Sequence, residues 1–113
     1  MTSFLISHPS FLAHDPGEYH PERPDRLRAV LAGLDEAAIA HLVPVTAPAA
    51  TLEQLTRVHP LEYVEAILAV RPPAGELVQI DADTLMSTGS ADAARHAAGA
   101  VVAGVDAVMR ETA

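Results

Sequence analysis

The sequence contains 113 residues, half of them hydrophobic and 19% charged, and it has no cysteine. That length suits at most one ordinary domain, and the composition excludes a disordered chain and any disulfide. All seven basic residues are arginines, against fifteen acidic residues, so the formal net charge is −8. A negative balance of this size opposes a broad phosphate-binding face, so direct nucleic-acid binding is not expected.

The N-terminal region lacks the features of a signal peptide. Its apolar patch, residues 4–6, follows no basic segment and is too short for a signal sequence. The longest later apolar run, residues 97–105, is well short of a membrane span. We therefore expect a cytoplasmic protein without a membrane partner.

The first half of the chain predicts two strands around one helix. Residues 3–7 suit a short buried strand, and residues 8–19, rich in proline, glycine and histidine, predict a long loop. A proline suits the first position of a helix over residues 24–39, where leucine and valine recur at helical spacing. Residues 42–45 are a strand candidate, in which Pro44 must lie at an edge or a strand end because it has no N–H to donate.

The second half predicts three helices and one extended segment. Thr51 and Gln54 fit a capping box that starts a short helix, which breaks before a second helix at Pro60. The second helix should bury a stripe of three residues, namely Val64, Ile67 and Leu68. Residues 78–80 are extended, and a final helix over 90–110 carries a seam of small residues suited to close packing: Ala93, Ala97, Ala100, Gly104 and Ala107. Alternating strands and helices favour an α/β layered domain, although so few strands do not decide their pairing.

Three motifs occur in order along the chain. They are His-Pro-Glu-Arg-Pro-Asp-Arg-Leu at residues 20–27, Arg-Val-His-Pro-Leu-Glu-Tyr-Val at 57–64, and Ile-Asp-Ala-Asp-Thr-Leu-Met-Ser-Thr-Gly-Ser at 80–90. One such motif is weak evidence, but three in order at plausible separations are strong evidence. Together they resemble the histone deacetylase and acetylpolyamine amidohydrolase family.

The resemblance implies an α/β fold, namely the N-terminal part of a three-layer arginase/deacetylase-like fold with a central parallel sheet. Residues 1–113 are then expected to be the N-terminal fragment of a single deacetylase-like domain, truncated before its metal site. The whole protein is expected to be a zinc-dependent hydrolase of acetyl-lysine peptides or other acetylated amines such as acetylpolyamines. The family's catalytic histidines and its metal ligands follow later in the chain, so the fragment alone is expected to bind no zinc and to be inactive.

The residues themselves also argue against a metal site in this segment. None of the six histidines forms the i, i+4 pair typical of zinc sites on helices. Ser87, Thr88 and Ser90 lack a nucleophile-elbow motif and are expected to cap the final helix. His59 is likewise expected to cap the helix that begins at Pro60, with Tyr63 packed beside it. We therefore assign no catalytic residue and no metal ligand here.

One pair of carboxylates has two interpretations. Asp81 and Asp83 lie between an extended segment and a helix, where aspartate commonly forms turns or caps. The resemblance implies a more specific role for Asp83, because it matches the family's rim aspartate, which accepts hydrogen bonds from the substrate backbone. Asp81 is the alternative candidate for that role.

The first motif supplies the remaining site candidates. By its position alone, Arg26 is a first-turn helix residue that is solvated or paired with Glu22. The resemblance implies instead that Arg26 lines an internal channel beneath the active site, which requires burial. It also implies that His20, Pro21 and Glu22 shape one wall of the substrate pocket. The rival function is a non-catalytic interaction module derived from the same fold, and a genuine stop after Ala113 would favour it.

Overall fold

The computed structural model describes residues 2–36 and 41–110. Helices and strands alternate along them in this order: β1 (Ser3–Ser7), the 3-10 helix η1 (Pro9–Ala13), α1 (Pro24–Glu36), β2 (Leu42–Thr46), α2 (Leu52–Thr56), α3 (Leu61–Leu68), β3 (Val78–Asp81), β4 (Thr84–Met86) and α4 (Ser90–Met109). The chain therefore has the predicted α/β class.

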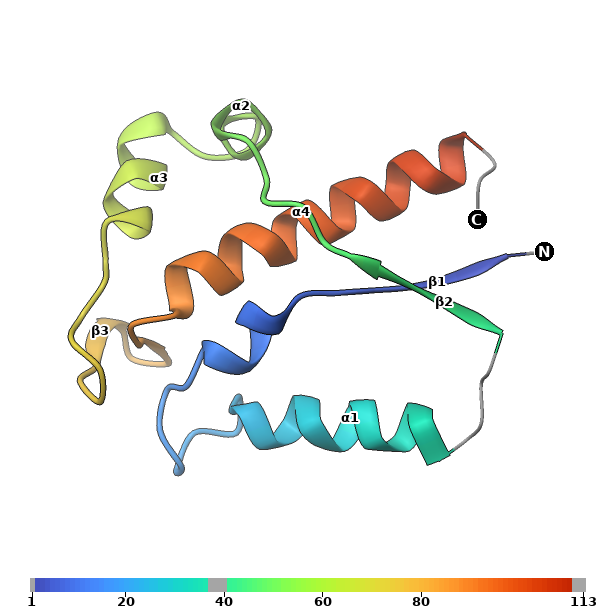
Figure 1. The fold of residues 1–113 in the computed structure, drawn as a ribbon. Helices are drawn as coiled ribbons and strands as arrows, with labels where there is room; N and C mark the ends of the chain where they lie inside the picture. Colours follow the sequence, from blue (N-terminus) through green and yellow to red (C-terminus); the bar gives the residue numbers. More distant parts are fainter. Residues whose placement is uncertain (1, 37–40, 111–113) are drawn as a thin grey trace.

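The two N-terminal strands form a parallel pair. Ser3 of β1 is opposite Leu42 of β2, and the register continues to Ser7 opposite Thr46. Figure 1 shows α1 and α4 on opposite sides of this pair. Parallel neighbours need a crossover connection, and α1 lies within it. The parallel sheet implied by the family resemblance is thus present.

The strands are less buried than the sequence predicts. Every residue of β1 is half-buried, because β2 is its single neighbouring strand among the described residues. Pro44 lies in the middle of β2, opposite Leu5. The other side of β2 pairs with no described strand, so the missing N–H of Pro44 interrupts no second ladder.

The N-terminal loop contains a helical turn that the sequence did not predict. The 3-10 helix η1 (Pro9–Ala13) begins after His8, whose Nδ1 accepts a hydrogen bond from the Ser10 amide at 3.0 Å. Histidine is an unusual cap, so composition gave no signal for it. The helix α1 begins at Pro24 as predicted, and its expected extension to Ile39 falls on residues 37–40, outside the described residues.

The capping box of α2 is confirmed. The Gln54 amide donates to Thr51 Oγ1 at 3.1 Å, and the Thr51 amide donates to Gln54 Oε1 at 2.9 Å. The next helix, α3, begins at Leu61 with Pro60 as its cap residue, and no side chain caps it. The prediction that His59 caps α3 is therefore wrong. Within the predicted stripe, Val64 is buried, and Ile67 and Leu68 are half-buried.

Residues 78–86 form an antiparallel hairpin, of which the sequence predicted only the first arm. Val78 is opposite Met86, and a bulge lies between Gln79 and Asp81. The second arm, β4 (Thr84–Met86), has only three residues, too few for a periodic pattern. Its Met86 is buried, whereas every residue of β3 is exposed.

The closest packing of α4 is against the segment that follows β2. The Ala50 amide donates to the Arg95 carbonyl at 3.0 Å, and Arg95 Nε donates to the Ala50 carbonyl at 2.7 Å. Gly99 is buried where this segment crosses the helix, and an added Cβ there would lie 1.8 Å from the Pro48 carbonyl oxygen. The predicted seam was thus partly wrong, because Gly99 rather than Ala97 makes the close approach and Ala97 is exposed.

The molecule is more extended than a compact domain of its size. Its radius of gyration is 15.5 Å, whereas a compact domain of this length has about 13 Å. Among the described residues, no large side chain is fully buried. None of the described helices combines the length and apolar character needed to cross a membrane.

Candidate functional site

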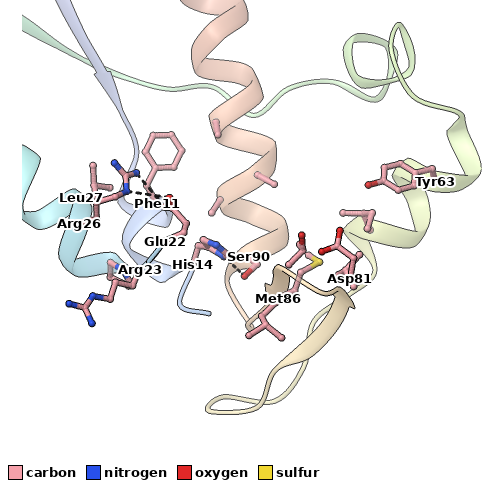
Figure 2. A pocket seen from close by; sticks show the side chains of 18 residues that line it. Phe11, His14, Glu22, Arg23, Arg26, Leu27, Tyr63, Asp81, Met86 and Ser90 are labelled. Atoms are coloured by element: carbon pink, nitrogen blue, oxygen red, sulfur yellow. Dashed lines mark hydrogen bonds and ion pairs between the residues drawn. The ribbon is translucent and has the colours of Figure 1, made fainter. Parts of the chain in front are cut away.

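A cavity of about 470 Å³ opens between five parts of the chain. It lies between η1, the start of α1, α3, the 78–86 hairpin and the first half of α4 (Figure 2). Most of its lining residues are apolar, and the residues with polar side chains are His14, Glu22, Arg23, Arg26, Tyr63, Asp81, Thr84 and Ser90. A mostly apolar cavity with a few polar groups is the usual form of a small-molecule pocket.

A polar cluster at the start of α4 joins the N-terminal loop to the pocket. His14 Nδ1 lies 2.6 Å from Ser90 Oγ, and Ser90 is only 4% exposed. The Ser87 amide donates to Ser90 Oγ at 2.8 Å, and the Asp15 amide donates to Ser87 Oγ at 3.0 Å. These serines therefore hold the loop against α4. The prediction that they cap α4 is wrong, because its cap residue is Gly89 and no side chain caps it.

His14 is the pocket residue that the sequence interpretation missed. The sequence assigned no role to this loop histidine, but the ring is half-buried and lines the cavity beside Ser90 (Figure 2). Its second ring nitrogen, Nε2, has no partner among the described residues. Ser90 is 76 positions away along the chain, so no local pattern could have indicated this pair.

Arg26 and Glu22 form an ion pair at one side of the cavity. Arg26 Nε lies 3.2 Å from Glu22 Oε2, with side chains 55% and 52% exposed. Both residues line the cavity, as Figure 2 shows beside Phe11. The pairing expected from their position is confirmed. The channel role of Arg26 requires burial, which the described residues do not supply, so that role stays a prediction.

His20 and Asp83, which are 63 positions apart in sequence, meet beside the cavity at a place that we call its rim, where Asp83 lies between the lining residues Asp81 and Thr84. His20 Nε2 is 2.8 Å from the Asp83 carbonyl oxygen, and His20 Nδ1 accepts from the Glu22 amide at 3.0 Å. Neither residue lines the cavity itself, and nor does Pro21, which is exposed. The structure thus brings together two site candidates that the sequence named separately.

Asp81, the alternative acidic candidate, lies at the cavity wall. One of its carboxylate oxygens accepts the Asp83 amide at 2.9 Å. The pKa of Asp81 is lowered from its ordinary value because the ionised form accepts hydrogen bonds from the Asp83 backbone and the Thr84 side chain. Asp81 is therefore occupied in shaping the hairpin turn, whereas the Asp83 side chain has no partner among the described residues.

Over residues 2–36 and 41–110, no three histidine, cysteine, aspartate or glutamate side chains come together as metal ligands. These residues therefore do not fit a zinc ion.

Tyr63 lines the cavity and is half-exposed, and its ring lies 5.4 Å from that of His59 in a tilted arrangement.

Comparison with known proteins identifies relatives of this chain. Residues 20–113 match the sequence profile of the histone deacetylase domain, beginning at His20. The chain is 35% identical over 102 residues to "Histone deacetylase 8" of Arabidopsis thaliana, covering 85% of this chain and 27% of that protein. It is 36% identical over 91 residues to "Histone deacetylase-like amidohydrolase" of Pseudomonas aeruginosa, covering 80% of this chain and 23% of that protein.

A solved structure agrees with these sequence matches. The crystal structure of the HDA15 HD domain superposes with a TM-score of 0.76 at 34% identity, covering 87% of this chain and 29% of that chain. The chain thus spans less than a third of each of these three proteins. Because the profile match covers most of the sequence and the folds agree, this chain belongs to the histone deacetylase domain family.

Proposed function

We propose that the whole protein hydrolyses an acetylated amine and that this chain forms one wall of the substrate pocket. The observation that carries the proposal is the His20–Asp83 contact at the rim of a mostly apolar cavity. An apolar cavity suits an acyl group on a methylene chain, and a free carboxylate at its rim suits the amide donors of a peptide. Acetyl-lysine peptides and acetylpolyamines both satisfy this description.

The cofactor belongs to the same proposal. The family resemblance implies zinc, which would polarise the amide carbonyl and activate water. The described residues offer no ligand set for it, so we assign its ligands to other parts of the whole protein. The roles left to this chain are to bind and orient the substrate. A cytoplasmic location is part of the same proposal.

A chimeric enzyme tests the proposal directly. This chain would replace the matching region of the Pseudomonas amidohydrolase, to which it is 36% identical. We expect zinc-dependent deacetylation of an acetyl-lysine peptide or of N-acetylputrescine by the chimera, and none by the 113-residue chain alone. Robust zinc-dependent turnover by the chain alone would contradict the assignment of the metal ligands.

Two substitutions in the chimera, one test and one control, examine the role of the rim carboxylate. Asp83→Asn removes the negative charge at the rim and keeps the side-chain size, so we expect a higher KM with kcat nearly unchanged, as for lost ground-state binding. Glu65→Gln, an exposed charge on α3 that does not line the cavity, should leave both values unchanged. A chimera that folds as the parent does and yet has no activity would favour the interaction module.

A further inference from the structure

The His20 ring is the hydrogen-bonded link between the 17–24 loop and the 78–86 hairpin. Among the described residues, no other hydrogen bond or ion pair joins these two segments. The Glu22 amide donates to His20 Nδ1 at 3.0 Å, so Nδ1 carries no proton. The neutral ring then has its proton on Nε2, which donates to the Asp83 carbonyl oxygen at 2.8 Å.

The hairpin turn has little else to fix its position. All four residues of β3 are exposed, and so are Ala82, Asp83 and Thr84. Met86, at the far end of β4, is the buried residue of the hairpin. The Asp83 amide bond to Asp81 is internal to the turn and does not attach it to the rest of the molecule. The placement of Asp83 beside the cavity therefore depends on a polar contact rather than on apolar packing.

We propose that His20 is a positioning residue that holds Asp83 at the pocket rim, which rests on the proposed function of that pocket. By binding the Asp83 carbonyl, the ring fixes the backbone from which the carboxylate extends. A substrate backbone then meets an acceptor that is already in place, so less ordering is required on binding. The same ring also shapes its own loop through Glu22, so one side chain couples both walls of the rim.

Two conservative substitutions separate these two contacts. In His20→Asn, the amide oxygen takes the place of Nδ1 and keeps the bond to the Glu22 amide, but the side chain is too short to reach Asp83. In His20→Gln, the amide nitrogen takes the place of Nε2 and reaches Asp83, but no acceptor lies at the Nδ1 position. His20→Ala loses both contacts. His41→Ala is the matched control, because His41 is exposed and has no partner among the described residues.

The first measurement is backbone order in the 113-residue chain by ¹⁵N relaxation. We expect the order parameters of Ala82 to Thr84 to fall from about 0.85 toward 0.6 in His20→Ala and His20→Asn. They should stay near wild type in His20→Gln and His41→Ala. Order at Glu22 should fall in His20→Ala and His20→Gln and persist in His20→Asn. An ordered hairpin turn in His20→Asn would overturn the proposal.

The second measurement is steady-state kinetics of the chimera. Because one hydrogen bond is lost, we expect KM to rise roughly three- to tenfold in His20→Ala and His20→Asn, with kcat nearly unchanged. His20→Gln should restore the wild-type KM. In an Asp83→Ala background, His20→Ala should add no further rise, because a positioning residue acts through Asp83. An unchanged KM in the presence of a disordered turn would overturn the link to substrate binding. An inactive chimera would contradict the proposed function, while the relaxation data would still show whether His20 holds the hairpin turn in place.

Discussion

At the scale of single residues, Gly99 shows how one position sets the approach of two segments. An added Cβ would lie 1.8 Å from the Pro48 carbonyl oxygen, which belongs to the backbone and cannot rotate away. We expect Gly99→Ala to lower the free energy of unfolding by about 1–3 kcal/mol, as overpacking does. Urea denaturation followed by circular dichroism measures this change.

Gly104 on the same helix is the matched control. An added Cβ there meets Ile6 Cδ1 at 3.5 Å, an ordinary contact distance. Gly104→Ala should therefore raise the free energy of unfolding by up to about 1 kcal/mol, because alanine is the better helix former. Equal effects of the two substitutions would refute the close approach at Gly99.

Also at this scale, Arg71 and Asp92 form a two-bond ion pair between the 69–77 connection and α4. Arg71 Nη1 and Nη2 lie 3.1 and 3.0 Å from the Asp92 carboxylate oxygens. The hydrogen bonds from Arg71 lower the pKa of Asp92 below its ordinary value of 3.8. When the pKa of a carboxyl group is lower in the folded than in the unfolded state, its ionisation stabilises the fold at pH values above the unfolded-state pKa. This stabilisation is lost as the pH falls through the folded-state pKa.

The Arg71→Gln variant should therefore lose less free energy of unfolding than the wild type when the pH is lowered from 7 to acid values. We expect the urea midpoint of the wild type to fall more than that of the variant between about pH 5 and pH 2. Arg57→Gln is the matched control, since Arg57, the C-terminal cap residue of α2, pairs with Glu53 of that same helix and joins no second element. An identical pH dependence in wild type and Arg71→Gln would show that the pair contributes nothing to the folded state.

At the scale of elements, the capping box decides whether α2 forms. The helix α2 has only five residues, and none of them is buried. Apolar burial therefore contributes little, and the reciprocal bonds of Thr51 and Gln54 satisfy the free amides of its first turn. Thr51→Ala should destabilise the protein by about 1 kcal/mol, whereas Thr51→Ser should be nearly neutral. Amide exchange of residues 53–56 should rise in the alanine variant alone.

At the scale of the whole molecule, one face of α4 is apolar and uncovered. Val101, Val105 and Val108 follow the i, i+4, i+7 spacing of one face and are 68%, 57% and 63% exposed. The matching solved domain is more than three times as long as the region this chain covers. We expect the remainder of a histone deacetylase domain to cover this face, because exposed apolar stripes of this kind mark interfaces.

Val105→Lys tests that expectation. In the 113-residue chain the change should alter stability by no more than about 0.5 kcal/mol, because the site is solvated. In the chimera it should sharply reduce soluble yield and activity, because a charge would be buried without a partner. Val58→Lys, at an 80% exposed position outside α4, is the control and should be tolerated in both proteins. Full activity of the Val105→Lys chimera would contradict a covered face.

The sequence by itself determined the local structure and the family. Pro24, the Thr51–Gln54 box and the apolar residues of β1 act over a few neighbouring positions, so their effects can be read from spacing. The three motifs likewise identified the family without a structure, and Asp83 and His20 were named as site residues from them. These predictions depend on residue type and order, which a sequence contains in full.

Only the tertiary structure decided which of these residues meet. The contact of His20 with Asp83, the pairing of His14 with Ser90 and the approach of Gly99 to Pro48 join residues 63, 76 and 51 positions apart. Such contacts depend on how helices and strands pack, and no local pattern encodes the partner. For the same reason, the predicted seam on α4 named Ala97 where Gly99 makes the contact. The sequence thus named the components of the rim, and the contact between the hairpin and the N-terminal loop brought them together.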